Sequence, residues 1–208
     1  MTLSLMIGSG LVAFSPMIAI LVLFVIPTPY FLILAIGGGF FWLVAALITG
    51  ALWYAFSLIN IWSVVVLESL FFQELSRFAF WYLNEIASKT ELMKTKGDIP
   101  KIKEDLSIGV GIATAHGVIM YGSILWEARG VGSYYLDSCP YLPLFFTSGI
   151  ISSIISILDV CWTIIAFDGY RTRSIPKIGF VISAHFISSF LTILNTMPGT
   201  GLCWMVIL

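Results

Sequence analysis

The chain has 208 residues, of which 59% are hydrophobic and 10% charged, and its formal net charge is −1. Soluble domains carry about 25% charged residues, so this composition excludes a water-soluble globular protein, and the balanced charge argues against a nucleic-acid partner. We therefore expect an all-α fold, a polytopic bundle of transmembrane helices that forms a single domain over residues 1–208 and is surrounded by lipid.

The apolar runs predict six full membrane spans and an incomplete seventh. A helix needs about 20 mostly apolar residues, each rising about 1.5 Å, to cross the hydrocarbon core. The first run lacks a positive leader and exceeds the roughly 7–15 apolar residues of a signal peptide, so we expect it to be a retained span. The predicted spans are residues 3–26, 31–58, 61–83, 106–126, 144–167 and 178–194, with a partial span at 201–208.

The basic residues predict the orientation of the bundle. The loop after the third span contains five lysines, and the loop after the fifth contains Arg171, Arg173 and Lys177. The loop after the fourth span contains only Arg129. Since basic loops stay in the cytosol, the loops after the third and fifth spans are expected there and the N-terminus outside.

The third span is unusual in carrying Glu68, Gln73, Glu74 and Arg77. Residues three apart share a helix face, so Glu74 and Arg77 are expected to form a structural ion pair. Glu68 has no local partner and must face protein or water.

The fourth span repeats small residues every four positions, at Gly109, Ala113 and Gly117. This spacing places them on one helix face, where a neighbouring backbone can approach closely, so it predicts a helix-docking surface for assembly. The simpler interpretation is the ordinary glycine richness of membrane helices. His116, in the same span, is expected to be a satisfied interior histidine rather than a ligand.

Asp159 and His185 lie at matching depths in the fifth and sixth spans. Each is eight residues from the basic loop that joins these spans, or about 12 Å along the helix axis. A lone buried aspartate costs about 2.5–3.5 kcal/mol at the membrane centre, which favours a hydrogen bond between the two. We expect an intramembrane polar clamp formed by Asp159 and His185, with a proton relay as the alternative.

No catalytic, cofactor or metal site is predicted. Asp159 and Asp168 are nine residues apart, so they lie on opposite helix faces about 13.5 Å apart along the axis, whereas an aspartyl protease needs carboxylates that nearly touch. The zinc, nucleophile-elbow and phosphate-binding motifs do not occur in the sequence either.

Short motifs in five of the predicted spans together resemble one known family, the anterior-pharynx-defective (Aph-one) subunits of γ-secretase. Each motif is weak, but their order and spacing are specific, and they extend from residue 8 to residue 195. They are GLVAFSP at 10–16, GGFFWLV at 38–44, QELSRFAF at 73–80, the small residues of the fourth span, SAH at 183–185 and LTILN at 191–195.

The resemblance implies a seven-helix, non-catalytic scaffold subunit with its N-terminus outside. Such a subunit stabilises a complex of presenilin, nicastrin and the presenilin enhancer subunit, which cuts substrates such as Notch and amyloid precursor protein inside the membrane. It also implies residence in the endoplasmic reticulum, Golgi, endosome and plasma membrane, and an assembly role for the small-residue motif.

This chain departs from the family pattern at two intramembrane positions. The family has intramembrane histidines in the fifth and sixth spans, whereas this chain has Asp159 in the fifth, and Ala113 replaces a middle glycine. The alternative from another functional class is a small transporter or channel with a polar path through Glu68, Asp159 and His185.

Overall fold

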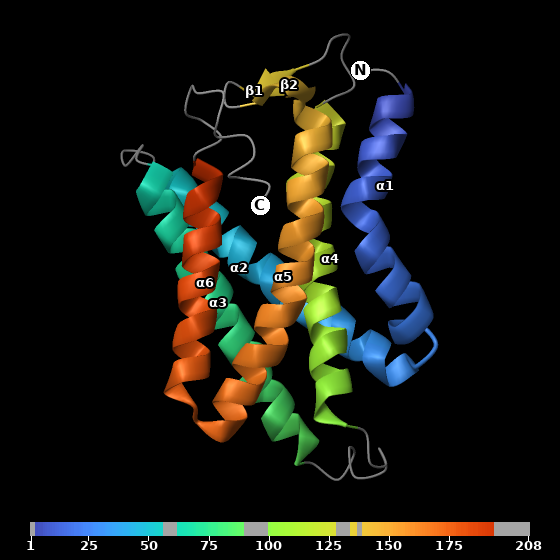
Figure 1. The fold of residues 1–208 in the computed structure, drawn as a ribbon. Coiled ribbons are helices and arrows are strands. Elements are labelled where there is room, and N and C mark those ends of the chain that lie inside the picture. Colours follow the sequence, from blue (N-terminus) through green and yellow to red (C-terminus); the bar gives the residue numbers. More distant parts are fainter. Residues whose placement is uncertain (1–2, 56–61, 90–99, 128–133, 137–138, 194–208) are drawn as a thin grey trace.

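The computed structural model describes residues 3–55, 62–89, 100–127, 134–136 and 139–193, and these residues are mostly helical (Figure 1). The predicted partial span at 201–208 lies outside the described residues. The elements are α1 (Leu3–Ile20), the π-helix η1 (Leu21–Val25), α2 (Pro29–Ala55), α3 (Trp62–Ser88), α4 (Lys101–Glu127), β1 (Tyr135–Leu136), β2 (Cys139–Pro143), α5 (Leu144–Thr172) and α6 (Ile175–Ile193).

The helices form one bundle in which α2 crosses obliquely behind the others (Figure 1). The antiparallel β1–β2 hairpin and the start of α1 lie at one end, which we call the hairpin end. The start of α4 and the connection between α5 and α6 lie at the opposite end. We call this the basic end, after Lys101, Arg171, Arg173 and Lys177.

Among the described residues, five helices are long and apolar enough to cross a membrane, which confirms the helical character of five of the predicted spans. They comprise α1 with η1, α2, α4, α5 and α6. The third predicted span is also a 27-residue helix, α3, but it is less apolar because it carries Glu68, Glu74 and Arg77. Many large apolar side chains point outward from the bundle, as expected for a surface in contact with lipid or with other membrane helices.

The tightest contact in the bundle is the crossing of α2 and α4, which glycines make possible. A Cβ atom on Gly38 would lie 2.8 Å from the carbonyl oxygen of Ile108, and one on Gly39 would lie 2.9 Å from that of Gly111. A Cβ atom on Gly111 would overlap the carbonyl group of Ala35. The backbones therefore touch directly, which maximises packing where lipid provides no hydrophobic driving force.

The core lies around α4, which packs against α1, α2 and α5. One buried cluster joins α2, α4, α5 and α6, and a second joins α1, η1, α2, α4 and α5. The first cluster comprises Leu34, Trp42, Ile108, Ile112, Trp162, Ala166, Phe167 and Val181. This packing holds α2, α4, α5 and α6 against one another. The polar side chains described next lie in the interior of the same bundle.

Candidate functional site

Five ionisable side chains from four helices meet inside the bundle. We call them the charge cluster: Glu74 and Arg77 of α3, His116 of α4, Asp159 of α5 and His185 of α6. Their apolar surroundings provide little solvation, so each charge depends on the others for stabilisation.

Arg77 lies at the centre of the charge cluster and joins its two carboxylates. Its Nη1 atom donates a hydrogen bond to Oε1 of Glu74, and its Nη2 atom donates to Oδ1 of Asp159 at 3.2 Å. The side chains of Arg77 and Asp159 are 2% and 0% exposed, and that of Glu74 is 15% exposed. The planar guanidinium group suits this role, since one fork of donors reaches two acceptors on different helices.

Each carboxylate also accepts a hydrogen bond from an imidazole ring. Nδ1 of His116 donates to Oδ2 of Asp159 at 2.7 Å, and Nδ1 of His185 donates to Oε1 of Glu74 at 2.6 Å. An ionised carboxylate only accepts hydrogen bonds, so this geometry places the ring proton on Nδ1.

An indole ring stacks on each imidazole. Trp42 of α2 lies with its ring centroid 4.8 Å from that of His116, and Trp162 of α5 lies 4.5 Å from His185. The contacts thus run without a break from Trp42 through the charge cluster to Trp162, and they link α2, α3, α4, α5 and α6.

The clamp expected between Asp159 and His185 takes a different form. Both residues belong to the charge cluster, but Asp159 pairs with His116 and Arg77, whereas His185 pairs with Glu74. The two are therefore joined through α3 rather than directly. Depth along α5 and α6 indicated that both side chains lie at one level, but it carried no information about which helix packs beside them.

The Glu74 and Arg77 side chains form the ion pair expected within α3, and this pair extends to Asp159. Glu68 is half-buried and lies six residues before Glu74 on the same helix. It does not belong to the lining of the cavity described next.

A cavity of about 320 Å³ extends from the charge cluster toward the hairpin end, between α3, α4, α5 and α6. His116, His185 and Trp162 line it beside the cluster. Apolar side chains such as Val66, Met120 and Ile155 also line it. Its other polar groups are the hydroxyls of Ser69, Tyr121, Ser148, Ser152, Ser156, Ser188, Ser189 and Thr192 and the amide of Gln73.

The small-residue face of α4 receives a helix of the same chain. A Cβ atom on Gly109 would lie 3.0 Å from Cα of Val160, and one on Gly117 would lie 3.4 Å from Oγ of Ser156. Ala113 is fully buried. The neighbour at this face is therefore α5, so any effect of the face on a partner protein acts through the shape of the bundle.

Three participants in the site had no assigned partner in the sequence analysis: His116, Trp42 and Trp162. The spacing of three residues between Asp159 and Trp162 was a usable signal, because it places both on one face of α5. The contact between Trp42 and His116 depends on the α2–α4 crossing, and the bond between His116 and Asp159 depends on the packing of α4 against α5. The order of spans reveals neither.

The arrangement can brace the bundle but shows no reactive geometry. With neutral imidazoles, two carboxylates and one guanidinium leave a single negative charge, and one proton on either histidine neutralises it. Within the described ranges, no three His, Cys, Asp or Glu side chains come together in a way that could hold a metal ion. Asp168 is half-exposed and pairs with Lys177 at the basic end, far along α5 from Asp159.

Comparison with known proteins identifies the family. The sequence model of the Aph-1 protein family matches residues 4–208. Among similar proteins, the γ-secretase subunit APH1-like of Arabidopsis thaliana is 29% identical over 94% of this chain and 83% of its own length. The γ-secretase subunit Aph-1 of Drosophila melanogaster is 28% identical over the same shares, and the γ-secretase subunit APH-1B of Homo sapiens is 27% identical over 97% of this chain and 83% of its own. The chain therefore belongs to the Aph-1 family.

Proposed function

We propose that this chain is a non-catalytic scaffold subunit of a γ-secretase complex, an intramembrane protease. The observation that carries the proposal is the family match over residues 4–208, together with relatives whose names describe them as γ-secretase subunits. Family membership fixes the complex, and the geometry of the site supports the scaffold role within it.

The geometry supports a scaffold because the charged groups in the bundle interior are engaged with one another. Both oxygens of Asp159 accept hydrogen bonds, and all four hydrogen bonds that join the five side chains connect oppositely charged or imidazole groups. Such a network holds four helices in one arrangement. Its two carboxylates are separated by the guanidinium group of Arg77 and do not share a proton as the pair of an aspartyl protease does. We infer that the chain supplies a fixed surface against which the other subunits assemble.

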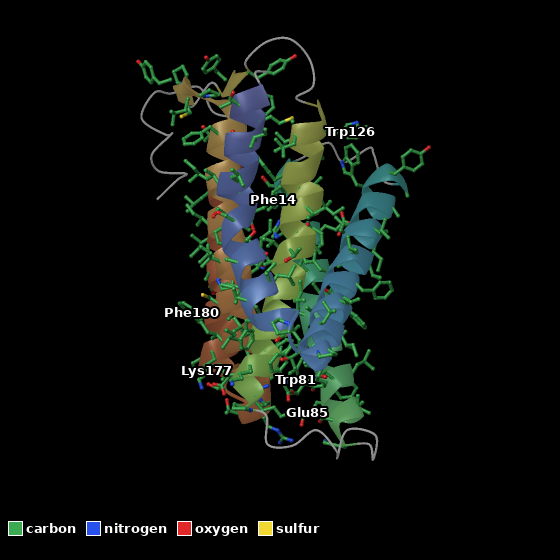
Figure 2. The ribbon with its side chains drawn as sticks, turned by 90° about the vertical axis from the view of Figure 1, so that its right-hand side faces the viewer. Phe14, Trp81, Glu85, Trp126, Lys177 and Phe180 are labelled. Atoms are coloured by element: carbon green, nitrogen blue, oxygen red, sulfur yellow. The ribbon has the colours of Figure 1, made fainter. Side chains whose placement is uncertain are left out.

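The proposed topology places the hairpin end outside and the basic end in the cytosol, with seven spans in all and the N-terminus outside. Two observations support it. Basic residues gather at the end opposite the N-terminus, as the positive-inside rule requires. Exposed Trp126 lies at the hairpin end, where an interfacial tryptophan is expected, and Lys177 lies at the other (Figure 2).

The partners in this proposal are presenilin, nicastrin and the presenilin enhancer subunit. The chain would stabilise presenilin and so support intramembrane cleavage of substrates such as Notch and amyloid precursor protein. As an integral multi-pass protein of such a complex, it would reside in the endoplasmic reticulum, Golgi, endosome and plasma membrane.

Affinity purification of the tagged full chain in a mild detergent, followed by mass spectrometry, tests the proposal. We expect presenilin- and nicastrin-like proteins in the eluate. The Gly109→Leu variant should lose them, because a Cβ there would already lie 3.0 Å from Cα of Val160 and a larger side chain forces α5 away from α4. Gly122→Leu should retain them, since a Cβ there meets open space. A folded, monodisperse chain that elutes without these partners would refute the scaffold role.

The cavity favours one second candidate, a transport function. It connects the hairpin end with His116 and His185 at the depth of the charge cluster. In this case the purified chain alone, reconstituted in liposomes, should move protons or small cations, and His185→Ala should abolish that movement. A scaffold predicts no flux from the chain alone, so the same assay separates the two candidates.

A further inference from the structure

A second cavity, of about 410 Å³, opens at the basic end between the start of α4 and the α5–α6 connection. It lies on the basic-end side of the charge cluster, and its wall combines charged and branched apolar side chains. The lining residues are Lys101, Ile102, Asp105, Ile164, Ile165, Asp168, Arg171 and Lys177.

The accessible charges of this basic-end cavity are mainly positive. Lys101 and Lys177 are 44% and 45% exposed, whereas the carboxylates of Asp105 and Glu104 are 2% and 1% exposed. Asp105 pairs with Arg171, and Glu104 pairs with Lys101 at 3.4 Å. Asp168 pairs with Lys177, but both side chains are half-exposed, so this ion pair is weak and an incoming anion can replace it. The lining has three basic and two acidic residues, and the buried carboxylate of Glu104 beside Lys101 balances the third positive charge.

Two further basic residues add positive charge at this end. Lys103 and Arg173 are exposed and lie two residues from Lys101 and Arg171 in the sequence. They do not line the cavity, but their charges make the potential around this end of the bundle net positive.

An apolar strip leads from the basic-end cavity into the membrane region of α5. Ile165 lines the cavity, and Cys161, Ile157 and Ile154 continue from it along exposed positions of the helix. Steps of three and four residues keep these side chains on one face. A hydrocarbon chain lying on this strip would start at the cationic rim and extend toward the hairpin end.

We propose that the basic-end cavity binds an anionic phospholipid. Its phosphate lies between Lys101 and Lys177, and one acyl chain follows Ile165, Cys161 and Ile157. Basic pockets between membrane helices on the cytosolic side are typical sites for anionic head groups. The inference rests on the membrane-spanning arrangement and not on membership of a complex.

Free inorganic phosphate is the competing ligand at the rim, but the strip favours lipid. Phosphate would use only the lysines and would leave the apolar surface unoccupied. A lipid uses both parts, and its two contacts reinforce each other because one molecule supplies head group and chain.

Native mass spectrometry of the detergent-solubilised full chain, titrated with phosphatidylserine or phosphatidylcholine of the same acyl chains, tests the proposal. We expect tighter binding of phosphatidylserine. Lys101→Gln and Lys177→Gln should each weaken it about fivefold, since a basic residue near an anionic head group contributes that factor. Lys89→Gln is the matched control, because it removes the same charge from the same end of the molecule. Lys89 follows α3, four residues after Glu85, and it does not line the cavity. Figure 2 shows Glu85 and Lys177 at this same end of the molecule.

Two outcomes would overturn the lipid site: equal binding of the two lipids, or lysine variants that bind phosphatidylserine like the native chain. Excess inorganic phosphate should leave lipid binding largely intact, and full displacement by it would point to a simple anion site instead. The lysine variants should still recover the γ-secretase partners in the affinity purification. Loss of lipid binding therefore tests the lipid site, and loss of partners tests the scaffold role.

Discussion

Replacing Arg77 with methionine removes the only cation among the five side chains of the charge cluster and leaves two carboxylates facing each other. Both are held in an interior where Asp159 is fully buried and Glu74 nearly so. Breaking a buried pair in this way costs about 3–5 kcal/mol, because the remaining charge is desolvated without compensation. At about 2–4 °C per kcal/mol for a chain of this size, the melting temperature should fall by roughly 6–20 °C.

The assay is thermal unfolding of the purified chain in mild detergent, followed by the loss of the monodisperse peak in size-exclusion chromatography. Arg77→Lys is an informative companion because it keeps the charge but loses the fork that reaches two helices, so an intermediate loss is expected. The triple variant Glu74→Gln, Arg77→Met, Asp159→Asn removes all three charges and should recover most of the stability. The reasoning fails if Arg77→Met melts like the native chain, or if the triple variant is no more stable than the single one.

Three further predictions concern packing, strain and burial. Gly111→Leu should prevent folding or cost about 1–3 kcal/mol, because its side chain collides with the α2 backbone, whereas Gly122→Leu should fold normally; detergent-extracted yield and melting temperature measure both. Arg173 has a φ of 51°, so Arg173→Gly should stabilise the α5–α6 turn by about 1 kcal/mol in the same melt, and a lower melting temperature would contradict this. Arg171→Met should cost about 3 kcal/mol because its carboxylate partner is buried, while Lys177→Met, from a half-exposed pair, should cost under about 1 kcal/mol; equal losses would refute the distinction.

The helical bundle could be predicted because hydrophobic length and charge content are properties of the sequence itself. Five of the predicted spans correspond to helices of sufficient length and apolarity. The span that carries Glu74 and Arg77 is interrupted by charges, and their spacing predicted that the two side chains pair within one helix. The structure adds that Arg77 also pairs with Asp159 of α5. Local patterns thus predicted the elements and the i,i+3 ion pair.

The sequence predicted the members of the site better than their partners. Asp159 and His185 could be placed at one depth by counting residues, but which side chain meets which depends on how helices from distant parts of the chain pack together. The same limit applies to α4, where the spacing of Gly109 and Gly117 predicted close packing but not that α5 is the neighbour. Gly38 and Gly111 allow the tightest crossing, but they lie on different helices. They therefore form no four-residue repeat that could be recognised in the sequence.

The central position of Arg77 has a consequence for the order in which the chain is built. During synthesis α3 enters the membrane before α5, so Arg77 is first accompanied only by Glu74, three residues away on the same helix. A charged residue at the centre of a lone span costs about 2.5–3.5 kcal/mol at the translocon, and the local partner offsets part of this cost until later helices arrive. When α5 follows, Asp159 meets a guanidinium already in place. The charge of Asp159 is thus compensated by a residue inserted earlier. Before α5 arrives, α3 is the helix whose insertion in the bilayer is least favourable.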